Sequence, residues 1–145
     1  MPPAPEELDM DIHNDIKVSR AISPAAAVTD NTAFVSEILD TANFAANELL
    51  IATGSLADAG ATFTVLLEES AADDMSGANS VADADLIGTE AAASFDQDDD
   101  DSTFKLGYRG NKRYIRATIT PAGNAGNAFI AAMWVQMNGR TAPQA

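Results

Sequence analysis

The alternation of apolar and polar residues along the chain predicts a series of short β-strands separated by turns. The clearest case is 113–120, RYIRATIT, in which Arg113, Ile115, Ala117 and Ile119 would share one face of a strand because side chains alternate along it. Branched and aromatic residues suit such a half-buried surface. Pro121 is expected to end this strand, since proline cannot donate to a sheet ladder. We predict a core strand with a basic outer face.

The same pattern predicts further strands elsewhere in the chain. They are 15–22, 32–39, 48–53, 61–69, 103–108 and 128–137, with a brief edge segment at 86–88. The segment 40–47 is expected to be a loop, and 70–84 a long surface excursion. The last strand is apolar on both faces, which is typical of a central strand or of one covered by a partner. Together these segments predict an all-β, single-domain antiparallel β-sandwich or jelly roll.

Composition divides the chain into three parts. Residues 1–14 carry prolines and carboxylates, which favour an extended N-terminal arm. Residues 15–138 form the predicted β-sandwich domain, and 139–145 form a polar C-terminal tail. The length of 145 residues fits one domain with a substantial core.

Charge narrows the classes of partner. The net charge of −14 argues against a nucleic-acid partner, because phosphates would be repelled by this surface. The chain has no cysteine, which excludes disulfides and thiolate zinc sites. Its first residues lack the basic and apolar regions of a secretory signal, and no apolar run approaches the roughly 20 residues that span a bilayer. We therefore expect no membrane partner and a chain made in a cytoplasm.

Candidate chemistry is sparse. His13 is the single histidine, which excludes a Ser-His-Asp triad, a three-histidine zinc site and a histidine dyad. The acidic run 96–101 begins with the spacing of a calcium-binding EF-hand loop, but Asp101 occupies its glycine position and Gly107 its twelfth position. We predict an exposed hairpin tip there, with an opportunistic cation as the alternative. We expect no enzyme, cofactor or metal, although residue counts leave a paired-carboxylate hydrolase open.

Five of the eight basic residues lie between positions 105 and 116. They either offset the acidic run across a hairpin or form a basic patch that docks acidic neighbours. Two aromatic residues also have two interpretations, because Trp134 and Tyr108 could line a sugar platform or pack in the core, and for Trp134 we favour the core. The predicted partner-binding residues are Ile12, His13, Lys105, Arg109, Lys112 and Arg116.

Three segments carry a family resemblance. They are DIHNDIKVSRAISPAAAVTDNTAFVSEILDT at 11–41, ATGSLADAGATFTVLLEES at 52–70 and TFKLGYRGNKRYIRATITPAGN at 103–124. They resemble small structural proteins of tailed bacteriophages and prophages. Within that class, a small acidic β-rich protein with an arm is similar to capsid decoration, or cement, proteins. In that class the usual C-terminal pattern is an apolar strand followed by a short tail that contains proline or histidine. The C-terminal stretch AAMWVQMNGRTAPQA departs from this pattern by carrying Trp134 and Met137.

The resemblance implies a non-enzymatic virion protein. It would bind the outer surface of the major capsid protein shell and stabilise it, after assembly in the host cytoplasm. Neighbouring copies of the chain would be its other partners, in a homo-oligomer for which a trimer is one option. The alternatives are a minor head-completion or tail structural protein and a glycan-binding β-sandwich module.

Overall fold

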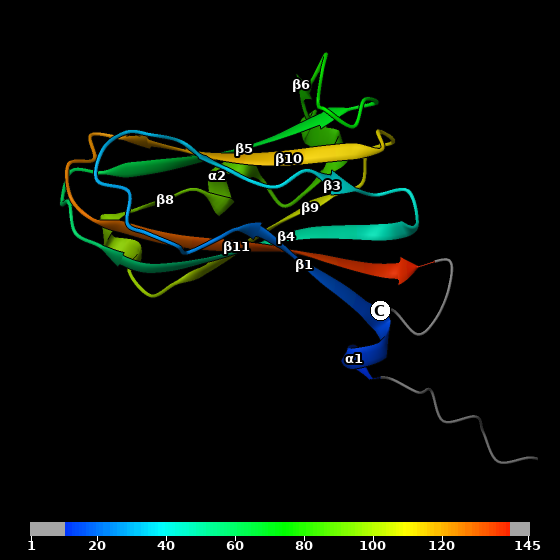
Figure 1. Cartoon of the computed structure of the whole chain (residues 1–145), viewed down its shortest axis with the longest axis horizontal. Helices are drawn as coiled ribbons and strands as arrows, with labels where there is room; N and C mark the ends of the chain where they lie inside the picture. Colours follow the sequence, from blue (N-terminus) through cyan, green and yellow to red (C-terminus); the bar gives the residue numbers. More distant parts are fainter. Residues whose placement is uncertain (1–10, 140–145) are drawn as a thin grey trace, which may run out of the picture.

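The computed structural model describes residues 11–139, which form two antiparallel sheets packed face to face (Figure 1). In order across the five-stranded sheet lie β1 (Ile16–Ile22), β11 (Ala128–Gly139), β4 (Phe44–Leu56), β9 (Thr103–Tyr108) and β7 (Leu86–Ile87). The six-stranded sheet contains β2 (Phe34–Val35), β3 (Leu39–Asp40), β10 (Tyr114–Ala122), β5 (Thr62–Ser70), β6 (Asn79–Ser80) and β8 (Phe95–Asp96). The short helical elements are α1 (Ile12–Asp15), η1 (Asp83–Asp85), α2 (Glu90–Ala93) and η2 (Gln97–Asp99). The predicted all-β antiparallel sandwich is confirmed.

Strand β10 lies at the centre of the six-stranded sheet. Its residues Ile115, Ala117 and Ile119 are fully buried, as their alternation predicts. It pairs with β5 over its whole length, and β2 and β3 pair with its other edge. Pro121 does not end the strand, because β10 continues to Ala122. Beyond Ile119 only β5 pairs with β10, so the proline lies where the strand is an edge and a missing donor is tolerated.

The strand predicted over 32–39 is divided into β2 and β3. Between them, the Ser36 amide donates to the Ala117 carbonyl of β10 (2.8 Å), but the next amide, that of Glu37, donates to the Ala21 carbonyl of β1 (2.8 Å). The chain thus bonds to one sheet and then to the other within two residues. This change of partner interrupts the ladder and cannot be inferred from an alternating pattern.

Strand β4 is longer than the predicted 48–53 and includes Phe44–Asn47, so the loop predicted over 40–47 is wrong for these four residues. Its buried residues alternate with partly exposed ones, so it faces the core on one side only. Strand β11 lies between β1 and β4, which confirms the central position predicted from its apolar faces. Trp134 of β11 is in the core at 1% exposure, and its indole nitrogen donates to the Glu37 carbonyl (3.1 Å).

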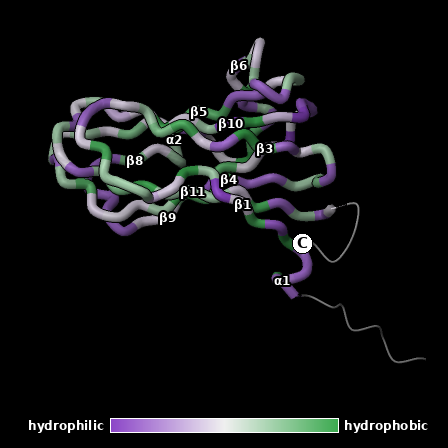
Figure 2. Tube along the Cα trace, in the orientation of Figure 1, coloured by the Kyte–Doolittle hydropathy of each residue, from purple (hydrophilic) through white to green (hydrophobic). Residues whose placement is uncertain are grey.

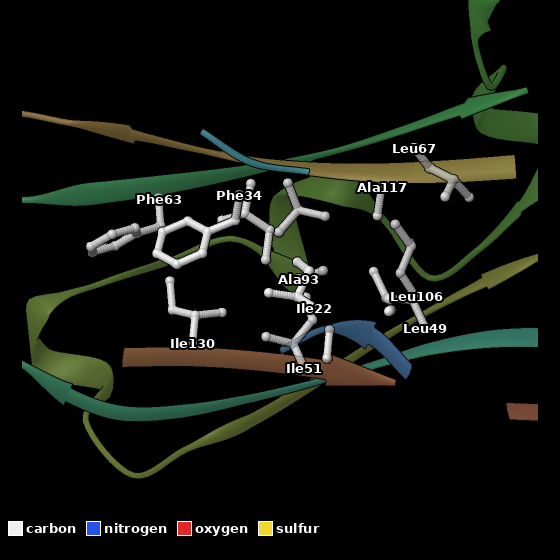
Figure 3. Close-up of a cluster of buried hydrophobic side chains, with 14 of the residues drawn as sticks. Ile22, Phe34, Leu49, Ile51, Phe63, Leu67, Ala93, Leu106, Ala117 and Ile130 are labelled. Atoms are coloured by element: carbon white, nitrogen blue, oxygen red, sulfur yellow. The ribbon is translucent and has the colours of Figure 1, made fainter. Parts of the chain in front are cut away.

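The core fills the space between the two sheets. Figure 3 shows Phe63 of the six-stranded sheet above Ile130 of the five-stranded sheet at one end, and Leu67 above Leu49 and Leu106 at the other. At one end the rings of Phe63, Phe95 and Phe104 stack in sequence, with centroids 5.2 and 5.1 Å apart. Helix α2 lies against β5 and β9 and contributes a buried alanine to the core.

The N-terminal turn α1 projects beyond the end of β1 and is hydrophilic (Figure 2). The Asp11 carboxylate caps it by accepting from the Asn14 amide. The extended conformation predicted up to residue 14 is therefore wrong for 12–14, because this local cap favours a helical turn. Residues 1–10 and 140–145, which hold the rest of the predicted arm and nearly all of the predicted tail, lie outside the described residues. Between residues 11 and 139, no helix has the length and apolar character needed to cross a membrane.

Candidate functional site

The six predicted partner-binding residues do not form one surface. Lys105 lies on the outer face of the five-stranded sheet, whereas Arg116 lies on the outer face of the six-stranded sheet and pairs with Glu68 (3.3 Å). Ile12 and His13 are exposed in α1, and Arg109 and Lys112 lie in the loop between β9 and β10. Within β10 the predicted basic outer face therefore contains a single basic residue, Arg116, and its charge is paired with Glu68.

The loop between β9 and β10, residues 109–113, is the most basic part of the described surface, and we call it the basic loop. Its sequence is RGNKR, with three cations in five residues. Tyr108 anchors it: the phenol donates to Glu69 Oε2 (2.7 Å) and accepts from the Lys112 amide (2.9 Å). Burial, and then the hydrogen bond to Glu69, raise the pKa of Tyr108, so the phenol keeps its proton.

Close packing also fixes the shape of the basic loop. A side chain at Gly110 would meet the ring of Tyr108 at 2.6 Å, so the position requires glycine. The Arg109 amide donates to the Asp85 carbonyl (2.9 Å), and its Nε donates to the Ala84 carbonyl (3.0 Å). These contacts attach the first part of the loop to the turn that precedes β7.

The last residue of the basic loop forms an ion pair with β3. Arg113 donates to both carboxylate oxygens of Asp40, at 3.0 and 2.9 Å. The hydrogen bond from Arg113 holds the pKa of Asp40 below its usual value. Lys112 is exposed and makes no ion pair among the described residues. Beside the loop is a hollow of about 390 Å³, bordered also by Thr41 and Asn47.

The second candidate surface is the outer face of the five-stranded sheet, which we call the apolar face. Its large exposed side chains are Val18, Ile87, Phe129, Met133 and Met137. Met133 is 47% exposed and Val18 is 56% exposed, although each lies within a strand. A hollow of about 960 Å³ lies over this sheet, lined mainly by apolar atoms of β1, β4, β9 and β11. By contrast, the outer face of the six-stranded sheet carries Thr62, Thr64, Thr118 and Thr120.

One carboxylate lies in the middle of the apolar face. Glu48 of β4 is directly opposite Gly107 of β9, where any side chain would collide with its carboxylate. Burial raises the pKa of Glu48, and the charge of Lys105 partly opposes this shift. The sequence shows that β11 is apolar. It does not show that Glu48 lies in the middle of the apolar face, because that position depends on the register that places Glu48 between Val135 of β11 and Gly107 of β9.

The acidic run 96–101 is not a hairpin tip. Strand β8 before it pairs with β5 in the six-stranded sheet, whereas β9 after it pairs with β4 in the five-stranded sheet. The run therefore connects the two layers, and Asp100 Oδ1 accepts from the Leu56 amide (2.9 Å). Among residues 11–139, none of these aspartates forms an ion pair with Lys105, Arg109, Lys112 or Arg116. Over residues 11–139, no three His, Cys, Asp or Glu side chains are grouped as metal ligands would be.

Comparison with solved structures gives a weak structural likeness. No family model and no curated protein matches the chain. Among solved structures, the chain is similar to a recombinantly expressed latent aurone synthase, a polyphenol oxidase, at 20% sequence identity and a TM-score of 0.32. The likeness covers 86% of this chain and 25% of that chain, so this chain spans about a quarter of its length. A likeness at this TM-score supports no conclusion about fold or function.

Proposed function

We propose that this protein is a non-enzymatic capsid decoration protein of a tailed bacteriophage or prophage. It binds the outer surface of the major capsid protein shell and stabilises it. The observation that carries the proposal is the basic loop, which concentrates cations on a protein whose net charge is −14. Such a loop is suited to docking on an acidic protein surface and unsuited to chemistry.

Electrostatics explain why the loop would be the contact. The acidic remainder of the protein is repelled by an acidic partner, so approach is favourable only where the potential changes sign. Arg109 and Arg113 are held by contacts within the protein, which leaves Lys112 as the most available charge. A pre-shaped loop also loses little conformational entropy when it docks. The same net charge favours the outside of a capsid over its DNA-facing interior.

The first experiment locates the protein. Purified particles from the phage or prophage that carries the gene would be analysed by mass spectrometry, and labelled with a gold-tagged antibody. We expect many copies per particle and label over the whole head. Label confined to one vertex or to the tail would instead indicate the alternative of a head-completion or tail protein. Absence from particles would refute the proposal.

The second experiment tests the basic loop by adding purified variants to heads that lack the protein. Lys112→Gln and Arg109→Gln each remove one positive charge, and we expect each to weaken binding several-fold and more so at low salt. Thr64→Glu is the matched control, because it changes the net charge equally on the polar outer face of the six-stranded sheet. Equal binding by all variants would contradict a role for the loop.

A third test concerns the N-terminal arm, residues 1–14, for which we propose a role in assembly. We expect deletion of residues 1–10 to leave the melting temperature of the isolated domain nearly unchanged, because this segment has few apolar residues to bury. We expect the same deletion to weaken binding to heads, where many weak contacts act together. Full binding by the truncated chain would mean that the segment has no role in docking.

The glycan-binding alternative lacks its proposed platform. Trp134 and Tyr108 are 1% and 2% exposed, so neither ring is available for stacking on a sugar. A glycan array tests the alternative directly, and we expect no binding above background.

A further inference from the structure

The apolar face departs from the usual pattern of an antiparallel sandwich. Such sheets pack one face on the core and expose a mainly polar one, as the six-stranded sheet does with its threonines, where Val35 of β2 is the large apolar exception. The five-stranded sheet is apolar on both faces along β11, from Phe129 to Met137. Five of the eight large exposed hydrophobic residues of 11–139 lie on this one surface. A contiguous exposed apolar surface of this kind marks an interaction site.

The strand register arranges this surface in rows. One row across the sheet is Val18, Val135, Glu48, Gly107 and Ile87. The next row is Arg20, Met133, Leu50 and Lys105. The second row has a cation at each end, and the first has a single acid near its middle. Both signs of charge are thus present on the same apolar surface, one row apart.

We propose that the apolar face is the interface of a symmetric dimer, in which a second copy of the chain packs its own apolar face against it. This surface is separate from the basic loop, and the inference goes beyond the proposed function. A second copy is the partner that these rows fit, because a two-fold contact requires a surface that is complementary to itself. Consider a two-fold axis that lies in the interface, runs perpendicular to the strands and passes between the two rows. Rotation about it places the first row of one copy over the second row of the other, so Glu48 of each copy lies beside Lys105 of the other.

The dimensions are compatible with such a pair. Four strands at about 4.8 Å and four rows at about 6.8 Å give roughly 500 Å² of flat sheet. Side-chain relief increases the accessible area toward the roughly 800 Å² per partner of a specific interface. Two sheets generally pack face to face at about 10 Å separation. We therefore expect a dimer near the lower limit of stable interfaces, with dissociation in the micromolar range.

The dependence of binding on salt concentration distinguishes this dimer from docking that is driven by charge. Two copies that each carry a net charge of −14 repel one another at long range, and the contact itself is mainly apolar. Added salt screens the repulsion, so we expect it to strengthen the dimer. Docking through the basic loop should weaken under the same conditions.

The test is sedimentation of the full chain from about 1 to 100 µM, a range that brackets micromolar dissociation. We expect reversible dimers for the wild type and monomers for Met133→Lys. Thr120→Lys is the matched control, since it adds the same charge at an exposed strand position of the other sheet, and it should dimerise as the wild type does. Circular dichroism and thermal melting of each variant establish that it is folded.

A charge swap tests the register of the pair. We expect Glu48→Lys and Lys105→Glu each to weaken the dimer several-fold, and the double variant to regain most of the loss, because the two charges meet across the interface. Three outcomes would overturn the proposal. They are a monomeric wild type throughout the range, undiminished dimers of Met133→Lys, and a dimer that forms only after residues 1–10 are removed. The last would mean that the chain's own N-terminal segment covers the face. Binding of the monomeric variant to heads would leave the proposed function intact.

Discussion

The substitution Ile119→Ala tests the assignment of faces on β10, the strand at the centre of the six-stranded sheet. Ile119 is fully buried, and its neighbours across the sheet are Val65 of β5 and Phe34 of β2. The change removes three carbon atoms. At about 0.8 kcal/mol for each buried methylene, their transfer to water alone costs about 2.4 kcal/mol.

A cavity term adds to this cost when the surroundings cannot collapse. Hydrogen-bonded strands flank Ile119 on both sides, so the backbone around it cannot move inward without breaking the ladder. We therefore expect the upper part of the usual range, about 3–5 kcal/mol. For a domain of this size, that loss lowers the melting temperature by roughly 10 °C. It is also a large share of the 5–15 kcal/mol by which native domains are usually stable.

Denaturant unfolding followed by tryptophan fluorescence measures the effect, because Trp134 is the only tryptophan and is buried. Thr120→Ala is the control: it alters the next residue of the same strand, which is exposed, and should cost less than about 1 kcal/mol. If Ile119→Ala left the unfolding midpoint unchanged, or if the control cost as much, the assignment of inner and outer faces would be wrong.

Three further predictions concern the basic loop and the acidic run. Tyr108→Phe should cost about 1–3 kcal/mol in denaturant unfolding, because the Glu69 carboxylate loses its donor; a loss below about 0.5 kcal/mol would show that the phenol is dispensable. Asp40→Asn should cost no more than about 1 kcal/mol at neutral pH, since its pair with Arg113 is half exposed. The pKa of Asp40 is lowered in the folded protein, so its contribution is present above the usual aspartate pKa and is lost as the pH falls through the lowered value. Unfolding midpoints of wild type and variant should therefore converge as the pH falls through the lowered pKa of Asp40, and a difference that persists below it would refute this. Calorimetry with calcium should detect no stoichiometric site in 96–101, and a saturable one-to-one isotherm would contradict that expectation.

The sequence alone determined the fold class and the core face of most strands. Alternation is a local property with a period of two, so the buried faces of β5, β10 and β11 follow from neighbouring residues without knowledge of their partners. The pattern also indicated that Trp134 lies in the core and that β11 is central. The same reasoning located the basic residues of the loop, which are adjacent in the chain.

Tertiary structure decided which local features meet. The acidic run joins two layers because β8 and β9 pair in different sheets, and the strand predicted over 32–39 divides because Glu37 bonds to β1. These outcomes depend on hydrogen bonds between segments that are distant in sequence. The apolar face and its central Glu48 arise in the same way, since cross-strand register alone brings Lys105 and Glu48 one row apart. Local patterns specify what a side chain is suited to face, whereas the pairing of distant strands specifies what it faces.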